Sequence, residues 1–477
     1  INLDLSASID YSCNAEIKNA SSAEYSSNVE IENESFAEFS CNAIINLDLS
    51  ASIDSSCNTE IINSSSVDAS LNVVINNITL IDMSANAFVP APRRYGGNWQ
   101  RKMWLNGEYY WRGRYDANQD EIIFEYIAKT GLEGNTWAEN ENAAIDASGF
   151  SASCIEADFT VRGARDGIPA TIHYSDGVDT WIAESDEASA TGWAWQNTTK
   201  VFDAVDANDE YCHVNLCANR TTPTPKFWAS AVFEDDSEGK QWIRTRQQTT
   251  GGDITGWQAV ADVSNVDNTN VISGSTIRSM GTAGAAKDDV IYVYKEGTAI
   301  RSRFWNGVSF ETIQDVDTTV YPITTKALFD FEHTTIAGTT IAGLLYRDAD
   351  GTMQWKERTD GSEDAWGANE ELESGMPCTL ACEGIVDWGS GFMIALYGKA
   401  MGVVGYRIHE MTSHEWHPAL VSGSHTFSTV TDAIVATLSF EQGQTPDRIP
   451  GEEAVPFSWI GTLGPSSYTT GWGIIYD

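Results

Sequence analysis

The chain carries two regular patterns of hydrophobic and polar positions, one before and one after about residue 88. In residues 1–86, apolar side chains fall on alternate positions, and units ending in asparagine recur every 14 residues, with a single unit of 16. The string INLDLSASID occurs at Ile1–Asp10 and again at Ile45–Asp54. A hydrophobic period of two is typical of β-strands, so this segment predicts short strands joined by turns.

A unit of this size with one apolar face needs neighbouring units to cover that face. The sequence therefore predicts a repetitive β-fibre stalk over residues 1–87, in which three identical chains wind around a shared axis. A solenoid formed by one chain is the alternative. Residues 88–97 are rich in proline, glycine and arginine, interrupt the repeat, and form the predicted linker.

Residues 98–477 repeat a different pattern, in which an apolar strand, a polar turn, an alternating strand and a closing aromatic residue follow one another. A complete copy has strands at Ile341–Tyr346 and Met353–Arg358, the turn Asp348–Gly351 between them, and Trp366 at its end. A further apolar strand precedes each copy. Four strands in roughly 50–64 residues is the size of a propeller blade.

The predicted fold class is therefore all-β, with the stalk followed by a β-propeller. Seven blades are favoured, and the alternatives are six blades, eight blades or an array of β-sandwiches. The last copy is short of one strand, which Arg93–Trp99 is expected to supply.

The blades resemble the repeats of β-propeller lectins, in particular the fungal fucose-binding type. The strings LLYRDADGTMQW, VYKEGTAIRSRFWNGVSF and IHYSDGVDTW carry this resemblance. The last string also resembles the Asp-box turn of sialidases, with one residue missing between Ser175 and Asp176. The arginine, glutamate and aromatic residue of each fucose-lectin blade recur irregularly here. The resemblance thus implies sugar recognition without the same pocket in every blade.

Composition narrows the range of partners. The chain has 68 acidic and 28 basic residues, a formal net charge of −40. Such a surface repels nucleic-acid backbones and anionic membranes, so neither is an expected partner. No run of 18 apolar residues occurs, and no membrane insertion is predicted.

The surplus of tryptophan, 17 residues, is the main indication of a binding site. An indole face beside charged hydrogen-bonding groups suits a sugar, whose CH groups stack and whose hydroxyls are bridged. Packing between blades is the alternative role of the same side chains. The candidate ligand-binding residues are Trp181, Glu184, Trp242, Arg244, Arg246, Trp355 and Arg358.

Other motifs indicate modification or metal binding less directly. Four asparagines occupy the fifth position of their repeat units within N-x-S/T sequons, which predicts N-glycosylation, although the same residues also suit turns. They are Asn19, Asn33, Asn63 and Asn77. The turns Asp116–Asp120 and Asp348–Gly351 resemble the start of calcium loops but lack the distal glutamate, so Ca²⁺ is the one cofactor left open and ordinary turns are favoured.

No nucleophile elbow, zinc-protease motif or phosphate loop occurs, and no catalytic residue or metal ligand is assigned. A repetitive rod with a propeller head resembles a tail fibre or receptor-binding protein of a tailed phage or archaeal virus. This resemblance implies a homotrimer on the virion surface, joined through its N-terminus to other virion proteins and binding a host surface glycan or glycoprotein without catalysis. A cellular surface adhesin or lectin, located extracellularly, and a secreted sialidase-like glycoside hydrolase are the alternatives.

Overall fold

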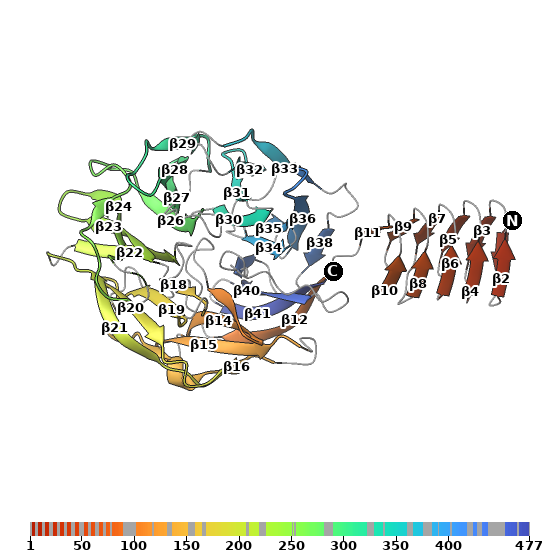
Figure 1. Cartoon of the computed structure of the whole chain (residues 1–477), viewed down its shortest axis with the longest axis horizontal. Helices are drawn as coiled ribbons and strands as arrows, with labels where there is room; N and C mark the ends of the chain where they lie inside the picture. The colour runs from red at the N-terminus through yellow and green to blue at the C-terminus, as the bar shows by residue number, and fades with distance from the viewer. Residues whose placement is uncertain are drawn as a thin grey trace.

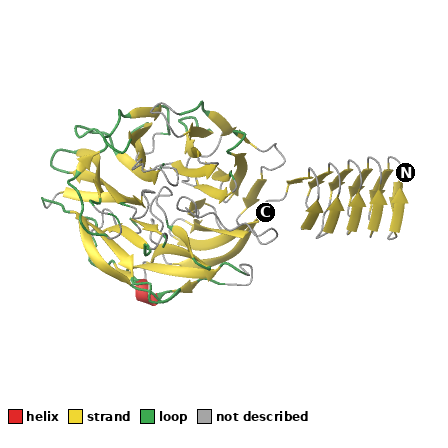
Figure 2. Ribbon diagram, in the orientation of Figure 1, coloured by secondary structure: helices red, strands yellow, loops and turns green. Residues whose placement is uncertain are grey.

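The computed structural model describes the strands of residues 2–88 and much of the chain from Lys102 to Tyr476. In the second part it describes residues 102–116, 119–130, 136–150, 158–164, 168–206, 209–218, 226–249, 251, 254–280, 290–321, 329–336, 339–359, 366–374, 384–389, 391–400, 403–416, 423–426, 432–436, 454–464 and 467–476. Strands dominate these residues, and the helical ribbon in Figure 2 is a short 3₁₀ turn, Glu141–Ala143. Among the described residues, no helix is long and apolar enough to cross a membrane.

The repeat segment forms two parallel sheets with strand orders β1-β3-β5-β7-β9-β11 and β10-β8-β6-β4-β2. Its strands are β1 (Asn2–Asp4), β2 (Ser8–Tyr11), β3 (Ala15–Lys18), β4 (Ser22–Tyr25), β5 (Val29–Glu32), β6 (Phe36–Phe39), β7 (Ala43–Asn46), β8 (Ser52–Ser55), β9 (Thr59–Ile62), β10 (Ser66–Ala69) and β11 (Val73–Asn76).

The register of these sheets follows the sequence repeat. Asn2 pairs with Glu16, one 14-residue unit along, whereas Ile45 pairs with Ile61 across the 16-residue unit. Each strand pairs within one chain, which is the arrangement of the solenoid alternative. The three-chain shaft stays a prediction, and the four sequon asparagines lie outside the described residues.

In the described part of the remaining chain, antiparallel sheets of four or five strands follow one another in sequence order, and Figure 1 shows them around a ring. The strands are β13 (Met103–Asn106), β14 (Tyr109–Asp116), β15 (Glu121–Ala128), β16 (Ala138–Glu139) and β17 (Ile145–Asp146); β18 (Phe159–Arg162), β19 (Thr171–Ser175), β20 (Thr180–Ser185) and β21 (Trp195–Phe202); β22 (Asp209–Ala218), β23 (Phe227–Asp235), β24 (Lys240–Gln247) and β25 (Ala261–Asp262); β26 (Ile272–Ser279), β27 (Val290–Glu296), β28 (Ala299–Trp305) and β29 (Gln314–Asp317); β30 (Phe329–Ile336), β31 (Thr339–Arg347), β32 (Met353–Thr359) and β33 (Glu370–Glu373); β34 (Gly384–Gly389), β35 (Phe392–Ala400), β36 (Val403–Glu410), β37 (Glu415–Trp416) and β38 (Gly423–Thr426). The arrangement is that of a β-propeller, as the four-strand pattern predicts.

The remaining antiparallel sheet joins the two ends of the chain. Its strand order is β12-β41-β40-β39, with β12 (Thr79–Phe88), β39 (Asp432–Ala436), β40 (Ala454–Gly464) and β41 (Ser467–Tyr476). The pairing of β12 with β41 runs from Thr79 with Tyr476 to Phe88 with Tyr468. The prediction that Arg93–Trp99 provides this strand is therefore wrong, because the strand comes from the end of the repeat segment. Arg93–Trp99 itself lies outside the described residues.

In two places a buried carboxylate, on the first strand of a sheet or directly before it, bonds to the first strand of the next sheet near the axis. The backbone amides of His213 and Val214 donate to the Asp158 carboxylate, at 2.8 and 3.1 Å. The amide of Ile385 donates to Asp330 at 2.8 Å. Because unpaired buried polar groups are costly, these bonds fix how one sheet docks on the next.

A second kind of contact between successive sheets recurs towards the outer edge of the ring. A cation on the third strand of one sheet donates to a backbone carbonyl on or beside the fourth strand of the preceding sheet. The four pairs are Arg246 with Val201 at 2.9 Å, Arg303 with Val263 at 2.8 Å, Lys356 with Val316 at 2.6 Å and Arg407 with Leu372 at 3.1 Å. We call each contact between successive sheets a joint.

Asp330 gives one joint a pH-dependent stability. Burial raises the pKa of its carboxyl to about 7, although Arg278 acts in the opposite direction. The folded protein therefore favours the protonated carboxyl of Asp330. The stabilisation that this protonated side chain provides is complete below about pH 4 and is lost as the pH rises through 7. We expect Asp330→Asn to raise the free energy of unfolding at pH 8 by about 2–4 kcal/mol and to have little effect at pH 4. Urea unfolding at both pH values measures this, with Asp267→Asn, at a side chain 82% exposed, as the control. A stabilisation that is equal at both pH values would contradict the assignment.

Candidate ligand-binding surface

The third strands place their side chains according to the register with the second strands. Trp181 pairs with Tyr174, and Trp242 pairs with Phe233, so the two tryptophans occupy equivalent positions in consecutive sheets. Tyr174, Phe233 and Trp242 belong to core clusters formed with the preceding sheets, and Trp181 shares the face of its pairing partner Tyr174. Of the three third-strand tryptophans predicted to be comparable, the pairing thus places Trp181 and Trp242 at equivalent positions.

The turn before Trp181 holds the indole in place. The carboxylate of Asp176 accepts the backbone amides of Val178 and Asp179, at 2.9 and 2.8 Å, and the Trp181 indole N–H at 2.7 Å. Gly177, with φ of 89°, allows the tight turn. This is the turn that resembles an Asp box, and its aspartate here orients an aromatic ring.

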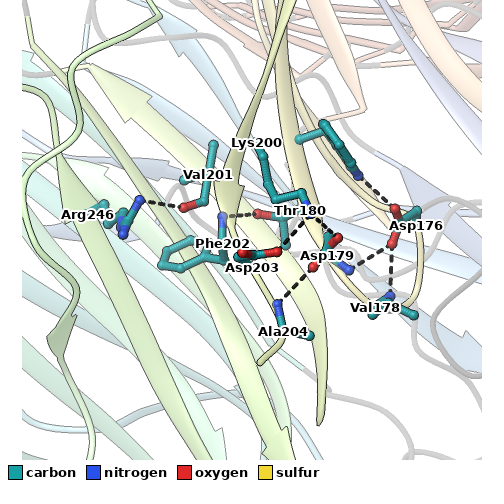
Figure 3. Close-up of polar contacts among 11 residues, drawn as sticks. Asp176, Val178, Asp179, Thr180, Lys200, Val201, Phe202, Asp203, Ala204 and Arg246 are labelled. Carbon is teal, nitrogen blue, oxygen red and sulfur yellow. Dashed lines mark hydrogen bonds and ion pairs between the residues drawn. The ribbon is translucent and has the colours of Figure 1, made fainter. Parts of the chain in front are cut away.

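Charged groups lie close to Trp181, and Figure 3 shows the bonds of Lys200 to Asp179 and Asp203. The Lys200 ammonium lies 5.0 Å from the centre of the indole ring and 2.8 Å from an Asp203 carboxylate oxygen. It also pairs with Asp179, and the bond to Asp179 is the main reason that the pKa of Lys200 is raised. The bond to Lys200 lowers the pKa of Asp203, whose side chain is 75% exposed. The result is a half-buried indole beside an exposed carboxylate that stays ionised.

A second cluster surrounds Trp242. Its indole N–H donates to Asp262 at 3.1 Å, and the Arg244 Nε atom lies 3.8 Å from the same carboxylate oxygen. The Arg244 guanidinium also donates to the Tyr211 hydroxyl at 2.5 Å and lies 3.6 Å from the Phe233 ring centre. Trp242 is 9% exposed, whereas the Asp262 side chain is 45% exposed. Aromatic, guanidinium and carboxylate groups therefore meet at one edge of the sheet.

Two other predicted ligand-binding residues, Arg246 and Glu184, make their contacts elsewhere. Arg246 fastens the joint through Val201, as shown in Figure 3. Glu184 is half-buried and accepts a bond from the exposed Asn197 amide at 2.5 Å. Neither residue contacts an indole of the two clusters in the contacts described.

The prediction that Trp355 and Arg358 bind a ligand is wrong. Both side chains lie in the core, where a ligand cannot stack on them. Trp355 is 0% exposed and packs against His409 and Trp416, and Arg358 is 1% exposed. The reason is register: Trp355 pairs with Leu345, one position away from Tyr346, the residue equivalent to Tyr174. Since side chains alternate along a strand, one position moves the tryptophan to the opposite face.

The sequence reasoning missed several side chains that the structure places beside the two tryptophans. They are Lys200, Asp203, Tyr211 and Asp262. Lys200, Tyr211 and Asp262 lie on first or fourth strands and Asp203 directly follows a fourth strand, whereas the sequence prediction concentrated on third strands. A charged residue next to the apolar residue of the fourth strand was the available signal.

Two observations concern the binding of a metal ion. Within the ranges that the structure describes, no group of three or more histidine, cysteine or acidic residues could hold a metal ion. The Asp348 carboxylate accepts the backbone amides of Asp350 and Thr352 and the Gln354 side chain. Those bonds are typical of a β-turn, which was the favoured interpretation of this segment.

Comparisons with known proteins give similarity of structure without similarity of sequence. No family model and no curated protein sequence matches the chain. AofleA from Arthrobotrys oligospora is 8% identical, with 72% of this chain and 90% of that chain covered and a TM-score of 0.42. A fucose-specific lectin from Aleuria aurantia is 11% identical, with coverage of 70% and 96% and a TM-score of 0.40. The Dos1 propeller is 8% identical, with coverage of 82% and 94% and a TM-score of 0.41. The ligand specificity of those proteins is not assigned to this chain.

Proposed function

We propose that this chain is a carbohydrate-binding attachment protein that recognises its ligand without catalysis. The observation that carries the proposal is the equivalent placement of Trp181 and Trp242, each beside an exposed carboxylate and a cation. Sugar CH groups stack on indoles, and carboxylates accept bonds from sugar hydroxyls. Asp203 and Asp262 supply these acceptors at the two clusters.

The biological setting we propose is a viral tail fibre or receptor-binding protein on the virion surface. Its head would be a seven-bladed propeller closed by β12, and its stalk would be the repeat segment, assembled as a homotrimer. Three heads on one stalk would convert weak sites into firm attachment to a host glycan or glycoprotein. Other virion proteins would bind the N-terminal end.

A cellular surface adhesin or lectin has the same requirements, and the genes beside this one distinguish the two: virion genes in one case, secretion genes in the other. A glycoside hydrolase is less compatible with the clusters. The carboxylates of Asp176 and Asp179 are occupied by bonds to the protein, which leaves neither available as a free general acid or base.

The proposed function predicts selective loss of glycan binding. We expect the full chain to bind on a printed glycan array, and Trp181→Ala or Trp242→Ala to weaken binding of the best glycan about tenfold, equivalent to about 1.4 kcal/mol. Lys240→Ala is the matched control, because this lysine lies on β24 and its ion pairs are with exposed carboxylates.

Circular dichroism of each variant would establish that the fold is retained. Binding of no glycan by the unmodified chain would reject the proposal. Release of free sugar from a bound oligosaccharide would replace it with the hydrolase alternative.

A further inference from the structure

The outer edge of sheet β18–β21 is longer than the edges of its neighbours. The strand order of this sheet ends at β21, so no further strand pairs with it among the described residues, and Figure 1 shows β21 on the outside of the ring. β21 has eight residues, whereas β16, β25, β29, β33 and β37, at the same place in five other sheets, have two to four. A long unpaired edge offers backbone amides and carbonyls to a strand of another chain.

A β-bulge interrupts β21 and brings an asparagine to the surface. Asn197 and Thr198 lie opposite a single residue of β20, Ala183, because the register shifts there by one. Asn197 has φ of 54°, a left-handed conformation that asparagine adopts more readily than most residues. Both residues of the bulge are exposed, and so is Gln196 before them. The bulge thus presents the Asn197 side chain to solvent.

Asn197 also begins the string Asn-Thr-Thr, which is an N-x-S/T sequon. The four sequons of the repeat segment and a further one at Asn219 lie outside the described residues. Asn197 is therefore the sequon asparagine whose surroundings can be examined. Its sequon is completed by Thr199, whose hydroxyl donates to the Asn197 carbonyl at 3.2 Å.

The hydrogen bonding of the Asn197 side chain is compatible with an attached sugar. Its amide nitrogen donates to Glu184 at 2.5 Å. A primary amide has two N–H groups, and this bond uses one of them. A sugar bonded to Nδ2 replaces the other hydrogen, so the bond to Glu184 can be kept.

We propose that Asn197 is a site of N-glycosylation and that its glycan shields the outer edge of β21. In the transfer, Nδ2 attacks the C1 atom of an oligosaccharide carried on a lipid diphosphate. The Nδ2–C1 bond forms as the bond from C1 to the diphosphate oxygen breaks. The lipid diphosphate leaves, one Nδ2 proton passes to a base of the transferase, and nothing is oxidised or reduced.

The position of the glycan explains its effect on the edge. A glycan is bulky and solubilising, and one attached at the bulge would stand near the middle of the exposed strand. Another strand could not then pair along the whole length of β21. This inference does not depend on the proposed function, because no ligand of the chain is involved.

The test uses the full chain, secreted from a yeast that N-glycosylates its exported proteins. Enzymatic release of the glycans in heavy-oxygen water converts each occupied asparagine to labelled aspartate, which mass spectrometry of the peptides detects. We expect the label at Asn197 in most molecules. Thr199→Val should abolish it, because the sequon requires a hydroxyl at its third position. Thr198→Val is the matched control and should keep it, because the middle position accepts any residue except proline.

Sedimentation of the same proteins measures the shielding. Thr199→Val lacks the glycan and should form larger species than Thr198→Val at equal concentration, although each variant adds one valine to β21. Asn197→Gly should associate in the same way with an unchanged unfolding midpoint, because glycine adopts a positive φ readily and keeps the bulge.

An unmodified Asn197 in the folded, secreted chain would overturn the inference. An occupied Asn197 with equal sedimentation of all three variants would reject the shielding role. Neither result affects the proposed function, which the glycan array tests separately.

Discussion

A chain that begins at residue 98 is expected to lose the closed ring, whereas a chain that begins at residue 77 is expected to keep it. The first lacks β12 and the second retains it. Nine residue pairs join β12 to β41, and their backbone hydrogen bonds contribute about 1 kcal/mol each. The expected loss is on the order of 5–10 kcal/mol, comparable with the entire stability of a typical domain.

Loss of β12 also leaves β41 as an exposed edge strand. Its unpaired amides and carbonyls form a template for pairing with another chain, so the shorter protein should associate. Urea unfolding and sedimentation of the two truncated chains measure the two effects separately. A peptide of residues 77–90 added to the shorter chain should restore its stability.

Equal unfolding midpoints for the two truncated chains would show that β12 does not close the ring. The comparison also affects the design of binding experiments, because a head isolated at the predicted linker would lack one strand of the last sheet. Full-length protein avoids this difficulty in the glycan measurements.

The repeat structure of the fold could be predicted from the sequence because it depends on local patterns. Alternation of apolar residues, polar turns and a closing aromatic residue recur within each sheet, and the turn at Asp348 has the bonds expected of it. The closing strand could not be found in this way. Thr79–Phe88 continues the alternating pattern of the repeat segment, and its pairing with β41 is a contact across nearly the whole chain.

The candidate site was predictable only in part, because the face of the sheet on which a side chain lies depends on the strand register. Trp181, Trp242 and Trp355 all occur on third strands. Trp181 pairs with a tyrosine of the second strand, whereas Trp355 pairs with the residue next to the equivalent tyrosine. A sequence pattern locates the ends of a strand only to within about 2–4 residues, and a shift of one residue reverses the face of a side chain. The position of Asp262 beside Trp242 becomes visible only in the folded sheet, because its carboxylate accepts the Trp242 indole N–H from the neighbouring strand.

Trp355→Ala is expected to destabilise the protein by about 3–5 kcal/mol, the usual cost of removing a large buried aromatic side chain. Trp355 is fully buried, its ring centre lies 5.3 Å from that of His409 and 5.2 Å from that of Trp416, and no ligand role is expected for it. Urea unfolding gives the change in free energy, and glycan affinity below the transition should be unchanged. A loss of affinity without a loss of stability would return Trp355 to the binding surface.

Gly343 provides the complementary test, because it makes the space for this indole. A Cβ atom at Gly343 would lie 2.0 Å from the Trp355 Cη2 atom, so Gly343→Ala forces the ring or the strand to move. We expect a cost of about 1–3 kcal/mol or more from overpacking. In the Trp355→Ala background the clash is absent, and the same glycine substitution should cost much less. Such non-additivity in a double-mutant cycle is the signature of direct contact. Additive free energies would instead mean that Gly343 is required by the β31 backbone rather than by the indole.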